Sequence, residues 1–173
     1  MRAASDAEAK SGGNVMIRRC IAADIPIIES IINEAAEKYR GVIPADCWHE
    51  PYMSRAQLER EITAGVNFSG WDADGELIGV MGAQRVKDAT LIRHAYVRTA
   101  QQGRGIGGKL LTAFSSEVDG KLLIGTWADA SWAIRFYQGH GFRLAPQDEK
   151  NQLLEAYWTI SQRQRDTSVV LMR

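Results

Sequence analysis

The sequence has no excess of charge of either sign and no long apolar run. Lys and Arg together number 21, and so do Asp and Glu, which gives a formal net charge of zero over 173 residues. A chain that binds nucleic acid usually has a basic excess. We therefore expect no nucleic-acid partner, and an anionic ligand must be held by a local site. No stretch approaches the ~20 apolar residues that a membrane-spanning helix requires, so we expect no membrane partner either.

Cysteine is also scarce, with Cys20 and Cys47 the two thiols. The first fourteen residues are small and polar and do not contain the apolar stretch of a secretory signal. We therefore expect a reduced, cytoplasmic protein with a flexible tail over 1–14. The remaining chain, 15–173, has the length of one ordinary domain, and a hydrophobic fraction of 45% is enough for a sizeable core.

Hydrophobic periodicity and turn residues predict a mixed series of strands and helices. Asp24 is an expected N-cap with Pro26 in the first turn of its helix, and Ser54-Arg55-Ala56-Gln57 is a capping box. The turn cluster at 72–76 predicts an antiparallel hairpin. The expected strands are 15–20, 66–71, 77–84, 90–97, 121–127, 142–144 and 168–172, and the expected helices are 24–40, 54–64, 106–118, 131–138 and 148–160. This order predicts an α/β fold with a mixed (α+β) sheet in one domain.

Four glycines, Gly103, Gly105, Gly107 and Gly108, lie between an expected strand and an expected helix. Glycine lets the backbone approach a ligand closely, and a helix start offers unpaired N–H groups and the positive end of the helix dipole. The segment therefore predicts an anion site that suits phosphate or pyrophosphate.

Two familiar phosphate-binding patterns match this segment only superficially. The spacing Gly103-x-Gly105-x-x-Gly108 fits the dinucleotide fingerprint, but that motif needs its first glycine directly after the strand, and five residues, Arg98–Gln102, intervene. The segment also resembles a nucleoside-triphosphate loop. Leu110, however, stands where Ser or Thr must hold Mg²⁺.

A third pattern fits better. Gln102-Gly103-Arg104-Gly105-Ile106-Gly107 resembles the Gln/Arg-x-x-Gly-x-Gly/Ala signature of the GNAT acetyltransferase superfamily. The strand that ends His94-Ala95-Tyr96-Val97 lies upstream at that family's spacing, and 133–142 is similar to its Ala-x-x-Phe-Tyr-x-x-x-Gly-Phe segment. The resemblance covers 15–142. It implies a GNAT-like fold. Such a fold has a central, mostly antiparallel sheet that is flanked by helices and whose fourth and fifth strands are parallel and splayed.

The resemblance implies an N-acetyltransferase that uses acetyl-CoA as cosubstrate and no metal. A primary amine would attack the thioester directly in a ternary complex, because neither cysteine lies beside a motif that would lower its pKa. Tyr137 matches the family's acid for the leaving thiolate, and the Ala95 N–H matches its oxyanion donor. The implied cosubstrate-binding residues are Ala95, Tyr96 and Val97 for the pantetheine and Gln102, Gly103, Arg104, Gly105, Ile106, Gly107 and Gly108 for the pyrophosphate, with Lys109 beside them.

Two positions depart from the family's pattern. Ala130 stands where many relatives have an Asn that contacts the pantetheine, and Leu91 stands where some relatives have a Glu general base. The base is therefore open among His94, His49, Glu50 and solvent.

The amine acceptor is expected on the side formed by the first two helices and the last strands. The aromatic residues of 40–52, together with Tyr157 and Trp158, favour a small-molecule or peptide amine of amphipathic character. The segment 148–160 is interpreted as a pocket wall, a homodimer contact or core. The alternative to an enzyme is a catalytically silent acetyl-CoA-binding or protein-interaction module of the same fold.

Overall fold

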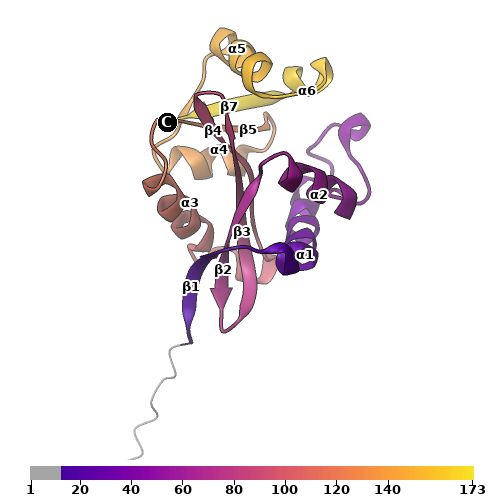
Figure 1. Ribbon diagram of the computed structural model, residues 1–173. Helices are drawn as coiled ribbons and strands as arrows, with labels where there is room; N and C mark the ends of the chain where they lie inside the picture. The colour runs from indigo at the N-terminus through magenta and orange to yellow at the C-terminus, as the bar shows by residue number, and fades with distance from the viewer. Residues whose placement is uncertain (1–12) are drawn as a thin grey trace, which may run out of the picture.

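The computed structural model describes residues 13–173 and contains a seven-stranded sheet in the order β1-β2-β3-β4-β5-β7-β6 (Figure 1). Neighbouring strands pair antiparallel except β4 and β5, which are parallel. The strands are β1 Val15–Arg19, β2 Asn67–Ala73, β3 Glu76–Val86, β4 Ala89–Val97, β5 Lys121–Trp127, β6 Arg143–Leu144 and β7 Ser168–Met172. The expected mixed sheet with parallel fourth and fifth strands is confirmed.

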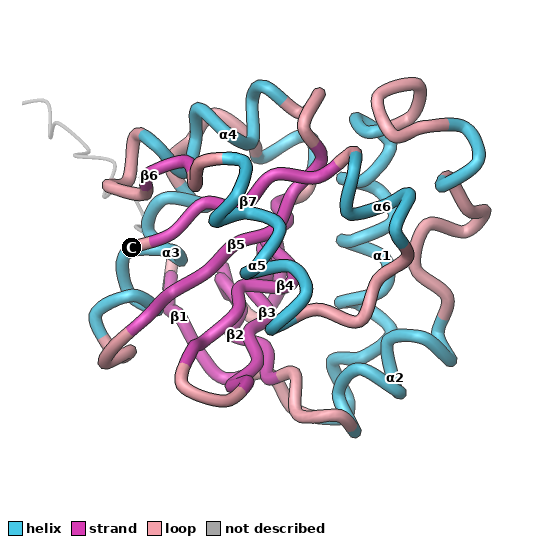
Figure 2. The backbone as a smooth tube through the Cα atoms, turned by 90° about the horizontal axis from the view of Figure 1, so that it is seen from above, coloured by secondary structure: helices cyan, strands magenta, loops and turns pink. Residues whose placement is uncertain are grey.

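Helices cover both faces of the sheet. In Figure 2, α1 and α2 lie on one side of the strands and α3 and α4 on the other, while α5 and α6 lie near β7. The helices are α1 Ile25–Ala36, α2 Arg55–Thr63, α3 Ile106–Ser116, α4 Ser131–Gln138, α5 Gln147–Tyr157 and α6 Gln162–Asp166. Residues 13–173 also contain four short 3₁₀ turns. Ala22–Asp24 precedes α1, Glu37–Tyr39 follows α1, Ala45–Cys47 precedes α2 and Thr99–Gln101 follows β4.

The core is divided between the two faces by the alternation of side chains along each strand. In β5, Leu122 and Ile124 pack with α3 and α4, whereas Leu123 between them packs with Leu153 and Leu154 of α5. The apolar stripe expected on the 148–160 segment is therefore buried against the sheet. This packing fixes α5 over the end of β5.

Side-chain caps begin two of the six α-helices of residues 13–173, α2 and α6. Ser54 accepts a hydrogen bond from the Gln57 N–H, as the capping box predicts. Asp24 stands at the N-cap position of α1, but its carboxylate does not cap that helix. It accepts instead from the Ile21 N–H and pairs with Arg18 of β1, so it joins the helix to the strand before it.

The segment before β7 differs from the prediction. The expected helix 148–160 is α5, Gln147–Tyr157, and the chain leaves the helix at Trp158. The short helix α6 was not predicted, because its residues are polar and show no apolar period. Ser161 caps it by accepting from the Gln164 N–H.

Most of the expected tail, 1–14, lies outside the described residues. Asn14 is described, and it exchanges two hydrogen bonds with Asp74 in the turn between β2 and β3. Over residues 13–173, none of the helices is long and apolar enough to cross a membrane.

Candidate functional site

The site lies where β4 and β5 separate. The two strands pair in parallel register from Ala89 opposite Lys121 to Ile92 opposite Ile124, and their pairing stops there. The β3–β4 ladder is irregular at the same level, because Gly82 pairs with His94 and Ala83 with Ile92, which leaves one extra residue in β4. The C-terminal half of β4 therefore has an edge that no strand covers.

The free edge of β4 presents backbone hydrogen-bonding groups to the gap. Directly after β4, the Arg98 N–H donates to the Ile78 carbonyl of β3. Because successive residues of a strand direct their backbone groups to opposite sides, Ala95 and Val97 direct theirs toward the gap. The Val97 carbonyl accepts from the Gln102 side chain. Ala95 keeps both its N–H and its carbonyl available for an extended ligand.

A cavity of about 920 Å³ opens from this edge toward α3 and α4, and we call it the α3-side cavity. Its lining contains Ala95, Tyr96 and Val97 of β4, and every expected residue from Gln102 to Gly108 except Arg104. Its size lies within the range of cofactor sites. The residues that the sequence identifies as candidates for pantetheine and pyrophosphate thus lie around one cavity.

The glycine-rich turn forms the end of this cavity at the start of α3. Gly103 and Gly105 have positive φ values of 76° and 79°, and Gly105 is the N-cap of α3 without a side-chain cap. The first N–H groups of a helix have no intrahelical partner. They lie here in the wall of the cavity, where a phosphate would find donors and the positive end of the helix dipole.

Two lysines line this cavity, and the sequence analysis named one of them, Lys109. Arg104 is exposed and does not line the cavity. Lys109 lines it, with Nζ 5.3 Å from the centroid of the Trp71 ring. Lys38, which the sequence analysis missed, lines it from α1's 3₁₀ extension, with Nζ 4.9 Å from the Trp132 ring. No sequence spacing connects Lys38 with the glycine turn.

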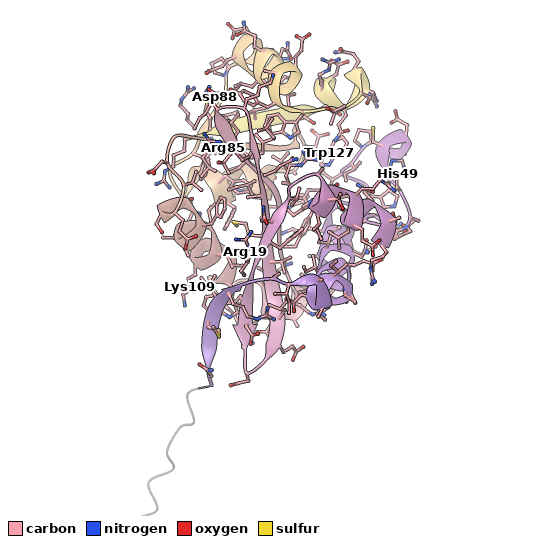
Figure 3. All side chains as sticks on the ribbon, viewed as in Figure 1. Arg19, His49, Arg85, Asp88, Lys109 and Trp127 are labelled. Carbon is pink, nitrogen blue, oxygen red and sulfur yellow. The ribbon has the colours of Figure 1, made fainter. Side chains whose placement is uncertain are left out.

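A second cavity of about 570 Å³ lies on the other side of the gap, and we call it the α2-side cavity. It is lined from the 40–52 loop, from α2, from β5 and from the segment after α5. In Figure 3, Lys109 lies on the α3 side of the sheet, whereas His49 and Trp127 lie on the side of this second cavity. Trp158 also lines it and packs against Gly125 of β5.

Four residues, Tyr39, Ala95, Tyr96 and Tyr137, line both cavities. Tyr137 comes from α4 and is 7% exposed. Burial, and to a smaller extent Tyr39, raises the pKa of Tyr137 well above its ordinary value, so the phenol is protonated at neutral pH. A protonated hydroxyl group therefore stands at the junction between the two cavities.

The three candidate bases have different surroundings. His94 is buried, lines the α2-side cavity and lies 2.5 Å from the carboxylate of Glu61 on α2. His49 lines the same cavity. Glu50 does not line it, because its carboxylate contacts Arg40 and the Trp48 indole N–H. Glu61 was missed by sequence analysis, since it lies on an ordinary polar helix.

The structure shows where the two residues that depart from the family pattern lie. Ala130 is the N-cap of α4 and makes no side-chain cap, so no side chain there reaches a ligand with a polar group. Leu91 is fully buried beside Leu123 and Leu153. It lies below the point where the strands separate and does not line either cavity.

Comparison with known proteins identifies the class. The profile of the acetyltransferase (GNAT) domain matches residues 32–154. The chain belongs to the GNAT acetyltransferase family, and as a member it is an acetyl-CoA-dependent acetyltransferase.

Solved structures support the same fold. PaiA N-acetyltransferase from Thermoplasma acidophilum, in complex with coenzyme A, is 18% identical with a TM-score of 0.69, over 92% of this chain and 98% of that one. A GNAT family acetyltransferase from Elizabethkingia anophelis with acetyl-CoA bound is 22% identical with a TM-score of 0.63, over 92% and 97%. The ribosomal-protein-S18-alanine N-acetyltransferase of Escherichia coli is 16% identical with a TM-score of 0.66, over 92% of each chain.

Proposed function

We propose that residues 15–173 form one domain that transfers the acetyl group of acetyl-CoA to a primary amine, by direct attack in a ternary complex. The observation that carries the proposal is the junction of two cavities at Ala95 and Tyr137. One cavity fits the cosubstrate and the other leaves room for an acceptor, so both substrates can be bound when the acetyl group moves.

In this proposal the α3-side cavity holds the cosubstrate. The N–H groups of the turn from Gln102 to Gly108 bind the pyrophosphate, and Lys109 adds positive charge beside it. The free edge of β4 at Ala95 and Val97 pairs with the extended pantetheine as an added strand would. The fit rests on the left-handed glycines and the uncovered strand edge.

At the thioester, two groups of this chain have defined tasks. The Ala95 N–H, which points into the gap, stabilises the oxyanion that forms when the amine attacks. Tyr137 then protonates the departing thiolate. Burial raises the pKa of this phenol, so it keeps its proton until the thiolate forms, and the same desolvation raises the pKa of the thiolate beside it, which offsets the weaker acidity of the phenol.

The acceptor belongs in the α2-side cavity. Tyr52, Trp127 and Trp158 supply aromatic surface there, and Glu61 supplies a carboxylate. This lining suits an amphipathic amine that is a small molecule or a peptide end. We place the reaction in the cytoplasm, in keeping with the two unpaired thiols.

The proposal is tested with purified protein, acetyl-CoA and a panel of amines, by detecting the released thiol. The panel contains amino acids, polyamines, aminoglycosides and peptides with free N-termini. Transfer to at least one amine is expected. Tight CoA binding without transfer to any amine would favour the silent module instead.

Tyr137→Phe is the matching variant. It removes the proposed acid with little change of volume, and loss of one acid typically costs roughly 10²–10⁴-fold in turnover. We expect kcat to fall with a small change in the KM of acetyl-CoA. Tyr157→Phe is the control, because it removes a hydroxyl that contacts Asp88 and Lys121 outside both cavities. Wild-type turnover of Tyr137→Phe at every pH would make Tyr137 structural.

A further inference from the structure

A histidine–carboxylate pair lies in the wall of the α2-side cavity, next to the proposed oxyanion donor. The Nε2 atom of His94 on β4 is 2.5 Å from Oε2 of Glu61 on α2, and both residues line the cavity. The imidazole is packed parallel to Phe68, with ring centroids 5.6 Å apart and an interplanar angle of 17°. Its orientation is therefore fixed from two sides.

The hydrogen bond to Glu61 defines which ring nitrogen of His94 carries the proton. A carboxylate only accepts, so Nε2 is the N–H and Nδ1 has the free lone pair. Nδ1 has no hydrogen-bond partner among residues 13–173. It is not one of the fully buried side-chain atoms of this range that lack a partner, so part of its surface is exposed. It is therefore accessible at the cavity that His94 lines.

The charged groups around the pair keep Glu61 ionised. Burial opposes its charge, but the hydrogen bond from His94 and the positive charge of Arg93 hold the pKa of Glu61 below its ordinary value. The phenol of Tyr96 also faces the imidazole, with ring centroids 6.3 Å apart. Burial raises the pKa of this phenol, which stays neutral. His94 thus has one anionic neighbour that can stabilise an imidazolium.

We propose that His94 is the general base for the acceptor amine and that Glu61 is its positioning residue, an inference that rests on the proposed function. Nδ1 takes a proton from the incoming alkylammonium, and Glu61 stabilises the imidazolium that forms. The free amine lone pair forms the C–N bond, and the carbonyl π pair moves to the oxygen beside the Ala95 N–H. The C–S bond then breaks, and the thiolate takes the proton of Tyr137. The second proton of the new amide nitrogen returns to the phenolate, and the His94 proton leaves to solvent.

The role predicts a dependence on the nucleophile that a structural pair would not produce. An alkylamine is almost wholly protonated at neutral pH and needs the base, whereas hydroxylamine is largely unprotonated and does not. We therefore expect His94→Gln to lower kcat for the alkylamine by roughly 10²–10⁴-fold and to leave kcat for hydroxylamine and the affinity for CoA nearly unchanged. The alkylamine probe is whichever of spermidine, lysine and an alanine-terminated peptide the wild type acetylates fastest.

Glu61→Gln tests the positioning role, with Glu59→Gln on the same helix as its control. Glu59 is exposed and lines neither cavity. We expect a smaller loss for Glu61→Gln than for His94→Gln, and wild-type kinetics for Glu59→Gln. In the wild type, kcat/KM for the alkylamine should reach its plateau below the pKa of the amine, because the base removes the proton of the bound alkylammonium. In His94→Gln and Glu61→Gln, kcat/KM should continue to rise with pH toward the pKa of the amine itself.

The outcomes separate the two proposals. Equal losses for alkylamine and hydroxylamine, or wild-type alkylamine kinetics in His94→Gln, would show that the pair is structural and overturn the assignment. If His94→Gln does not fold, a wild-type pH profile in Glu61→Gln overturns it. Wild-type protein that binds CoA but acetylates neither the amines nor hydroxylamine overturns the proposed function and the base together.

Discussion

Gly105 turns the chain into α3 with a left-handed backbone, at φ 79°. A side chain in this conformation costs roughly 1–2 kcal/mol, and relaxing that strain would displace the first N–H groups of α3. We expect Gly105→Ala to weaken CoA binding, measured by calorimetry. Gly120→Ala is the matched control, because Gly120 has φ 90° and equally open space around its Cα but lies outside the cavity. Equal CoA affinity in both variants would show that the turn's geometry is not needed.

The four glycines of this turn look alike in the sequence and differ in the structure. Gly103 and Gly105 need their positive φ, whereas Gly107 has room for a Cβ at 3.5 Å from the Phe136 ring. A Cβ at Gly108 would lie 2.6 Å from the His140 ring. The spacing predicted an anion site at this turn, but which glycine serves the backbone and which serves packing depends on tertiary neighbours.

At the scale of elements, Arg18 ties β1 to its surroundings. It pairs with Asp72 of β2 and with Asp24 before α1, each at 2.8 Å. These hydrogen bonds lower the pKa of both carboxyl groups in the folded state. A lowered folded pKa gives stability that is present above the ordinary Asp value of ~3.9 and is lost as the pH falls through the folded value.

We therefore expect the urea midpoint to fall between pH 7 and pH 3, and to fall less in Arg18→Gln because that variant lacks the linkage. Arg19→Gln is the control, since the exposed side chain of Arg19 hydrogen-bonds to the Asn67 side chain and to no carboxylate among the described residues. If the urea midpoint of Arg18→Gln fell as much between pH 7 and pH 3 as that of the wild type, the pH dependence would arise from groups other than Asp24 and Asp72.

The segment after α5 presents Trp158 to the α2-side cavity, and the indole packs against Gly125. We expect Trp158→Ala to raise the KM of the acceptor and to leave CoA affinity unchanged. Leu153→Ala is the contrast, because Leu153 of α5 is buried outside both cavities. This variant should lower the stability of the protein without changing the acceptor KM. If light scattering showed a dimeric wild type and a monomeric Trp158→Ala variant, Trp158 would instead be an interface residue. If the variant lost stability and nothing else changed, Trp158 would be a core residue.

Sequence patterns predicted the elements that carry their own local signals. The capping box at Ser54 and the period of β5 led to bounds within a residue or two of those observed. The pair of His94 and Glu61 spans 33 residues and joins a strand to a helix. No local signal predicts such a contact, because it arises only when α2 packs beside β4.

At the scale of the whole molecule, the splayed strands place two cavities on either side of one gap. The family resemblance predicted this splay and the cosubstrate side in outline. The sequence analysis expected the acceptor beside the 40–52 segment and Trp158, which line the α2-side cavity, but it did not name Glu61 of α2 or the residues of β5 that complete the lining. These parts are far apart in sequence, so no local pattern shows that they meet around one cavity.

The arrangement predicts a sequential mechanism, because both substrates can be bound before the acetyl group moves. An acetyl-cysteine route is the alternative. Cys47 lines the α2-side cavity, whereas burial raises the pKa of the Cys20 thiol to about 11 and keeps it protonated. We expect intersecting lines in double-reciprocal plots of initial rate, and a Cys47→Ala variant that retains its turnover, with Cys20→Ala as the control. The covalent route would be established by parallel lines together with an acetylated protein in mass spectrometry. Cys47→Ala should then lose both the acetylation and the turnover. A sequential pattern with active Cys47→Ala would mean that the amine meets the thioester directly, at the gap between β4 and β5.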